Sequence, residues 1–109
     1  MLRRAVLAAG LCAVAWRASA EDDRLLLAAE AGELEAQYVL GRDLAVGRGR
    51  GQDLVQALAW LELAASRAPA GHALRFIAAS DIAALRPQMQ PEQIDEAARL
   101  SASLRARFP

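Results

Sequence analysis

His72 is the only histidine of the 109-residue chain, and histidine is the side chain that most often transfers protons in catalysis. A catalytic histidine needs a nucleophile or an orienting carboxylate beside it. Ser80 and Asp81 follow His72 by two helical turns or more, so a shared helix does not place them alongside it. The further ligands that a metal site needs are also missing. We therefore interpret His72 as a structural or helix-capping residue.

The acidic residues and the cysteine do not indicate a catalytic or metal site either. The one cysteine, Cys12, excludes an internal disulfide and a cysteine-cluster metal site. No spacing among the central acidic residues predicts a general acid–base pair or a metal cage. These residues are Glu33, Glu35, Asp43, Asp53 and Glu62. The sequence therefore predicts no catalytic residue, no cofactor and no metal site, and we expect that the protein is not an enzyme.

The segment from Gly47 to Gly51 alternates glycine with Arg48 and Arg50. Such a loop could contact phosphate, but the chain has no lysine to reach a nucleotide, and no strand is expected before the loop. No aromatic residues are interleaved to stack bases, so we expect no nucleic-acid binding. The pattern favours a solvated turn, and Arg48 and Arg50 remain candidates for contact with a partner.

Composition and spacing predict that helices position these residues. Alanine and leucine, both strong helix formers, account for 27 and 17 residues, whereas aromatic residues make up only 5%. Apolar periodicity and end signals predict five helices, at about 22–31, 33–46, 53–67, 72–86 and 91–107. The wide apolar face of the third helix predicts burial on two sides. The expected fold class is all-α.

Three residues predict specific features of these helices: two helix starts and one close contact between helices. Asp53 is expected to cap the third helix, and Pro91 fits the first position of the fifth. Gly41 lies in the middle of the second helix, where glycine costs about 1 kcal/mol relative to alanine. That cost is understandable if another helix passes so close that a Cβ atom would clash. We therefore predict a tight helix contact at Gly41.

The first twenty residues have the order of a secretory signal. Arg3 and Arg4 form a short positive start, residues 5–16 are apolar and uncharged, and Ala18-Ser19-Ala20 provides a cleavage site. A membrane-spanning helix needs about 20 apolar residues, so this run is short for a span. We predict a signal peptide at 1–20, cleaved after Ala20, and a periplasmic or secreted protein with no stable membrane span. An uncleaved anchor is the alternative.

Residues 29–68 contain a set of small, apolar and turn residues at regular spacing. The set comprises Ala36, Leu40 and Gly41, then Gly47 and Gly49 of a Gly-x-Gly turn, then Asp53, Ala57 and Trp60. This pattern resembles the Sel-one-like repeat, a relative of the tetratricopeptide repeat. The resemblance implies a short α-solenoid of antiparallel helix hairpins in residues 21–109, with a complete repeat at about 29–68 and a degenerate one at about 69–108. Arg50 and Gly51 depart from the family pattern, which usually has Val and often Pro there.

The resemblance implies a binding role, because such repeats mostly serve as adaptors between proteins and share no catalytic residues. Solenoids usually need about three units for stability, and this chain has fewer, so we predict that a protein partner or a second copy docks on a helix face or an open end. A small periplasmic hydrolase-like enzyme and a membrane-held accessory subunit are the alternatives. Candidate contact residues are Tyr38, Arg42, Arg48, Arg50 and Trp60, although the spacing of Tyr38 and Trp60 favours core packing.

Overall fold

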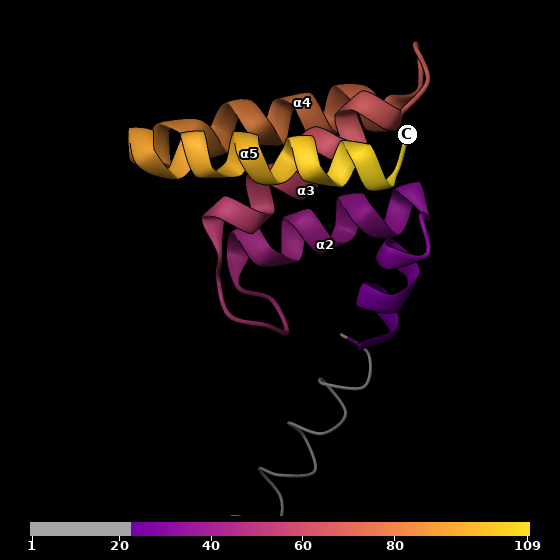
Figure 1. Ribbon diagram of the computed structural model, residues 1–109, viewed down its shortest axis with the longest axis horizontal. Coiled ribbons are helices and arrows are strands. Elements are labelled where there is room, and N and C mark those ends of the chain that lie inside the picture. Colours follow the sequence, from indigo (N-terminus) through magenta and orange to yellow (C-terminus); the bar gives the residue numbers. More distant parts are fainter. Residues whose placement is uncertain (1–22) are drawn as a thin grey trace, which may run out of the picture.

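The computed structural model describes residues 23–109, so the predicted signal peptide lies outside the described residues (Figure 1). The described part is all-helical, which confirms the expected fold class, and it contains no strand. Residues 23–30 are helical. The remaining elements are α2 (Leu34–Val46), α3 (Leu54–Arg67), α4 (Ala73–Leu85), a 3₁₀ turn η1 (Arg86–Gln88) and α5 (Pro91–Arg107).

The predicted helix ends are correct to within about a residue, because short-range capping fixes them. The Asp53 Oδ1 accepts a hydrogen bond from the Gln56 N–H at 3.0 Å, which confirms Asp53 as the cap of α3. His72 Nδ1 accepts from the Leu74 N–H at 3.1 Å, so His72 caps α4, as expected. Pro91 occupies the first turn of α5. At the end of α2, Gly47 adopts the left-handed conformation, with a φ of 76° that glycine tolerates best.

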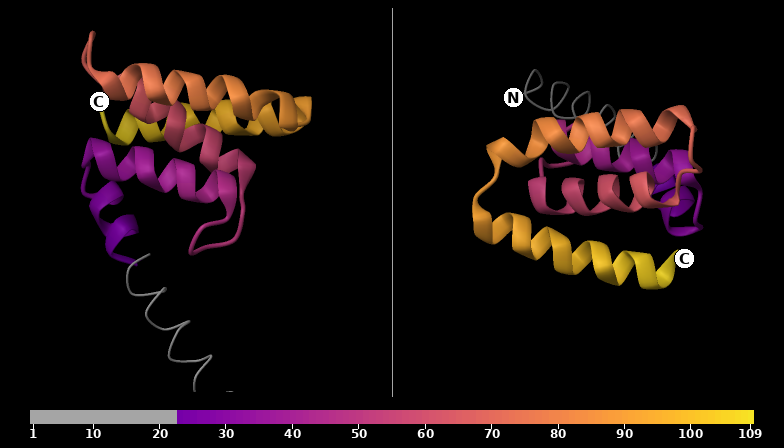
Figure 2. Two further views of the ribbon diagram at one scale, coloured as in Figure 1. Left: turned by 180° about the vertical axis from the view of Figure 1, so that it is seen from behind. Right: turned by 90° about the horizontal axis from the view of Figure 1, so that it is seen from above.

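Helix α3 is the centre of the molecule. It packs against α2, α4 and α5, and half of its residues are buried. The views in Figure 1 and Figure 2 show α2 on one side of α3, with α4 and α5 beyond it. The prediction that this helix is buried on two sides is therefore confirmed. Burial of its leucine and alanine side chains supplies the largest continuous part of the core.

The tight contact predicted at Gly41 is present between α2 and α3. A Cβ atom added to Gly41 would lie 2.9 Å from the Leu61 Cγ and 3.2 Å from the Leu61 backbone nitrogen. Real carbon atoms do not pack so closely, so only glycine allows these two backbones to approach as they do. The prediction for Gly41 is confirmed, and the reason is the space that Leu61 occupies.

The second pair of helices is arranged differently from a packed hairpin. Helices α4 and α5 both pack along α3, and within residues 23–109 they make no extensive contact with each other. Figure 2, seen from above, shows α3 lying between them. Each of the two helices buries only three residues, in one narrow stripe, and that stripe faces the core around α3. The other large apolar residues of α4, Phe76 and Ile77, are exposed and do not join α4 to α5.

Candidate interaction surfaces

Helices α2 and α4 enclose a first hollow, which we call the α2–α4 hollow. Its volume is about 410 Å³, and Leu61 of α3 contributes to its lining. The loop after α2 also contributes, because Gln52 Nε2 donates to the Ala45 carbonyl at 2.9 Å and so holds the loop against the helix. The lining residues are Arg42, Ala45, Val46, Gln52, Leu61, Asp81, Ala84, Leu85 and Gln88.

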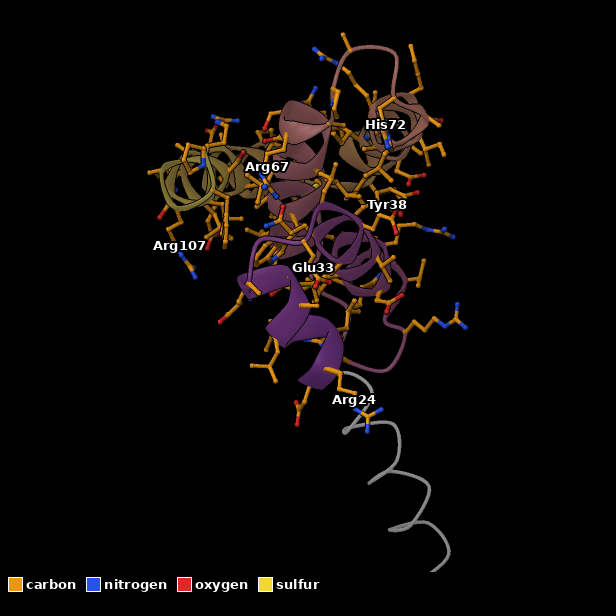
Figure 3. The ribbon with its side chains drawn as sticks, turned by 90° about the vertical axis from the view of Figure 1, so that its right-hand side faces the viewer. Arg24, Glu33, Tyr38, Arg67, His72 and Arg107 are labelled. Carbon is orange, nitrogen blue, oxygen red and sulfur yellow. The ribbon has the colours of Figure 1, made fainter. Side chains whose placement is uncertain are left out.

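A hydrogen bond beside this hollow joins α2 to α4. The Tyr38 hydroxyl donates to the Asp81 Oδ2 at 2.6 Å, and the Arg42 guanidinium lies 5.9 Å from the centre of the Tyr38 ring. Figure 3 shows Tyr38 at the boundary of the two helices. Burial raises the pKa of Tyr38 to about 12, and the hydrogen bond and charge of Asp81 add to the increase, whereas Arg42 opposes it. At neutral pH Tyr38 is therefore a hydrogen-bond donor and not a base.

The raised pKa of Tyr38 predicts a loss of stability at high pH. The folded protein holds the proton more tightly than the unfolded chain, so this stabilisation is complete below about pH 10 and is lost as the pH rises through about 12. Tyr38 is the only tyrosine, so its absorbance titration reports this group alone. We expect a midpoint near 12 in the folded protein and near 10 in denaturant.

The variant Tyr38→Phe is the matched control for this titration. It removes the hydroxyl and the bond to Asp81, and we expect it to lower the unfolding free energy at neutral pH by about 1 kcal/mol. It also removes the tyrosine-dependent loss of stability between about pH 10 and 12. Equal midpoints in the folded and unfolded wild-type protein would contradict both the burial of Tyr38 and its hydrogen bond to Asp81.

Helices α4 and α5 form the walls of a second hollow, the α4–α5 groove, and α3 forms its floor. The groove has a volume of about 530 Å³, and its lining combines small side chains with three arginines. The lining residues are Glu62, Ala65 and Ser66 of α3, Arg75, Ala79 and Ile82 of α4, Arg86 of η1, and Ala98 and Arg105 of α5. The groove exists because α4 and α5 each pack on α3 and not on each other.

The arginines of this groove differ in their partners. Arg86 pairs with Glu62 at 2.9 Å. The Arg75 guanidinium makes a long contact of 3.5 Å with the Ala68 carbonyl, and Arg105 donates to the Ser101 hydroxyl at 3.0 Å. Arg75 and Arg105 therefore contact only neutral groups within residues 23–109. Because α4 and α5 run in opposite directions, Arg75 near the start of one and Arg105 near the end of the other lie toward the same end of the groove.

The structure places the five candidate contact residues in different environments. Tyr38 and Trp60 are buried, with exposed fractions of 7% and 5%, and the Trp60 ring packs 6.2 Å from the Phe108 ring. Arg42 is exposed and lines the α2–α4 hollow. Arg48 is exposed and Arg50 is half-buried, and both lie in the loop after α2. The structure thus brings Tyr38 and Arg42 together, whereas the rings of Tyr38 and Trp60 leave little surface for a partner.

Sequence reasoning missed the residues of the α4–α5 groove. Arg75, Ala79, Ile82 and Arg86 follow one another at i, i+4, i+7 and i+11, so they form one stripe along α4 and the start of η1. That spacing was a usable signal for a shared face. Asp81 was considered only as a neighbour of His72 on its own helix, although its partner is Tyr38, on a different helix.

No reactive cluster stands out in the described part of the chain. Among residues 23–109, no group of three histidine, cysteine or acidic side chains is placed to hold a metal ion. In the same range, no helix has both the length and the apolar character needed to cross a membrane. Comparisons with protein-family models, with curated proteins and with solved structures found no match.

Proposed function

We propose that the protein is a non-catalytic interaction module of the cell envelope, an adaptor that binds a protein partner on its helical surface. The observation that carries the proposal is the pair of hollows that flank α4, because an adaptor must contact two molecules at once. Both hollows have small or apolar side chains in their lining and arginine at their walls. Arginine and well-packed apolar contacts are typical of the central part of protein interfaces.

The repeat assignment and the exported location are parts of the same proposal. The packing of α2 against α3 supports a complete Sel-one-like repeat at about 29–68, and the separation of α4 from α5 fits a degenerate repeat at about 69–108. A signal peptide at residues 1–20 would deliver residues 21–109 to the periplasm or the medium. The formal charge of that product is −3, from 10 arginines and 13 acidic residues, so a non-specific nucleic-acid partner is disfavoured.

The α2–α4 hollow is the surface that we assign to the partner protein. Arg42 is exposed at this hollow, and its guanidinium can form two parallel hydrogen bonds with a carboxylate. Val46 also lines this hollow and is 72% exposed, so it offers a partner an apolar side chain beside Arg42. The partner is therefore expected to present a carboxylate next to an apolar side chain.

Crosslinking in living cells, followed by mass spectrometry, tests this proposal. We expect the chain to be recovered from the periplasmic fraction with Glu21 as its first residue and with a crosslinked protein partner. Arg42→Glu should reduce the yield of this partner about tenfold, because it places like charges opposite each other. Arg99→Glu, which makes the same charge change on an exposed part of α5, should leave the yield unchanged.

Other outcomes of the same experiment would favour the alternatives. Equal partner yield from wild type and Arg42→Glu would remove the α2–α4 hollow from the proposal. A chain that keeps Met1 and fractionates with the membrane would favour the membrane-held accessory subunit. Turnover of an ester or amide substrate by the purified protein would favour the hydrolase-like enzyme.

A further inference from the structure

The helical segment 23–30 presents an unusual stripe to solvent. Asp23, Leu27 and Glu30 are spaced at i, i+4 and i+7, so they share one face, and all three are exposed. Leu27 is 68% exposed, whereas the neighbouring Leu25 and Leu26 pack against the core. We call these three residues the acidic stripe. It consists of one apolar side chain with a carboxylate on either side.

The α4–α5 groove is complementary to the acidic stripe in charge. Its alanines, Ala65, Ala79 and Ala98, leave room for a helix to approach closely, and Ile82 provides an apolar contact for a leucine. Arg75 and Arg105 have no carboxylate partner within the described residues. A docked segment with two carboxylates would give each of these arginines an oppositely charged partner.

The stripe and the groove lie on opposite sides of the molecule. Figure 1 and Figure 3 show segment 23–30 on the far side of α2, and the groove is lined by α3, α4 and α5 with no residue of α2. A molecule therefore cannot place its own stripe in its own groove. A second copy can do so, and because the two surfaces differ, the contact is head-to-tail and leaves a free stripe and a free groove at the ends.

We propose that the acidic stripe of one copy docks in the α4–α5 groove of a second copy, with Leu27 against the alanines and Ile82 of the groove and with Asp23 and Glu30 facing Arg75 and Arg105. The contact covers two ends that a short helical repeat leaves exposed. The inference rests on the proposed interaction role but uses a different face, since the partner protein is assigned to the α2–α4 hollow. Self-association and partner binding can therefore fail independently.

Sedimentation of the exported chain with reciprocal charge reversals tests the docking. The wild-type protein should show a mass that rises with concentration and falls with added salt. The groove variant Arg75→Glu/Arg105→Glu and the stripe variant Asp23→Arg/Glu30→Arg should each associate with themselves roughly tenfold more weakly or worse. Their mixture should associate again, because the reversed stripe of one variant meets the reversed groove of the other, and the two unchanged surfaces meet each other, so both contacts join opposite charges.

The matched control is Arg99→Glu/Arg107→Glu, which makes the same change in charge at two exposed arginines outside the groove. It should associate like the wild type, and circular dichroism should show unchanged helix content in every variant, since all the substituted residues are exposed. A wild type that stays monomeric, a groove variant that assembles normally, or a mixture that stays dispersed would each overturn the proposal. So would a groove that binds an acidic segment of a different protein in place of the second copy.

Discussion

Gly41→Leu is expected to lower the free energy of unfolding by about 3 kcal/mol or more, the largest effect of any single substitution proposed for this protein. The first added carbon already lies 2.9 Å from the Leu61 Cγ and 3.2 Å from its backbone nitrogen. The backbone atom belongs to α3 and cannot move without shifting the whole helix. The gain in helix propensity from replacing glycine is only about 0.8 kcal/mol, so the clash determines the result.

Thermal unfolding followed by circular dichroism measures this effect. For a domain of this size, a loss of about 3 kcal/mol corresponds to a fall in Tm of about 15 °C. Gly41→Ala should show a smaller fall in the same direction, because it adds only the first carbon. Gly51→Leu is the control, since nothing lies within 4 Å of an added Cβ there and its φ is not positive. A Tm for Gly41→Leu equal to that of the control would show that α2 and α3 are not in close contact.

Arg67→Met is expected to have the second largest effect, a loss of about 2–3 kcal/mol. Arg67 Nη1 donates to the Gly32 carbonyl at 2.9 Å and to the Gln37 Oε1 at 2.7 Å. Gln37 is fully buried, and its Nε2 donates in turn to the Ala29 carbonyl at 3.0 Å. Methionine keeps much of the apolar stem but leaves the buried amide oxygen without its donor. The cost of that unsatisfied acceptor dominates the loss.

A double-mutant cycle with Gln37→Leu separates the hydrogen bond from the loss of each side chain. Chemical denaturation should give a coupling between the two sites of about 1–2 kcal/mol, because both substitutions interrupt one network. Arg99→Met, on an exposed part of α5, should change the free energy of unfolding by less than about 0.5 kcal/mol. Additive effects of Arg67→Met and Gln37→Leu would mean that the two side chains act independently.

Most of the helix boundaries could be predicted because the signals that set them are local. Asp53 caps the first turn of α3, which follows it directly in the sequence. Pro91 begins α5 after the short loop that follows α4. The close helix contact at Gly41 could also be predicted, because a glycine that destabilises the middle of a helix implies a neighbouring helix. The sequence did not identify Leu61 as the contacting residue. Local propensity and capping depend on residues within about four positions, which a sequence displays in order.

The candidate surfaces could not be predicted in the same way, because they depend on how helices are placed in space. Tyr38 and Asp81 are 43 positions apart, and Arg67 and Gln37 are 30 apart, so no local pattern connects them. The α4–α5 groove arises because two helices both pack their buried stripes on α3. The resemblance to a hairpin repeat predicted direct packing of α4 against α5, and such packing would leave no groove between the two helices.

The central position of α3 has a consequence for how the molecule unfolds. In a long linear array each unit depends mainly on its neighbours, and terminal units can melt separately. Here both helix pairs share one helix, because α2, α4 and α5 all bury their apolar side chains against α3. Loss of any outer helix exposes part of α3, and loss of α3 removes the common support of all the others. The helices of residues 23–109 are therefore expected to form a single cooperative unit that melts as a whole.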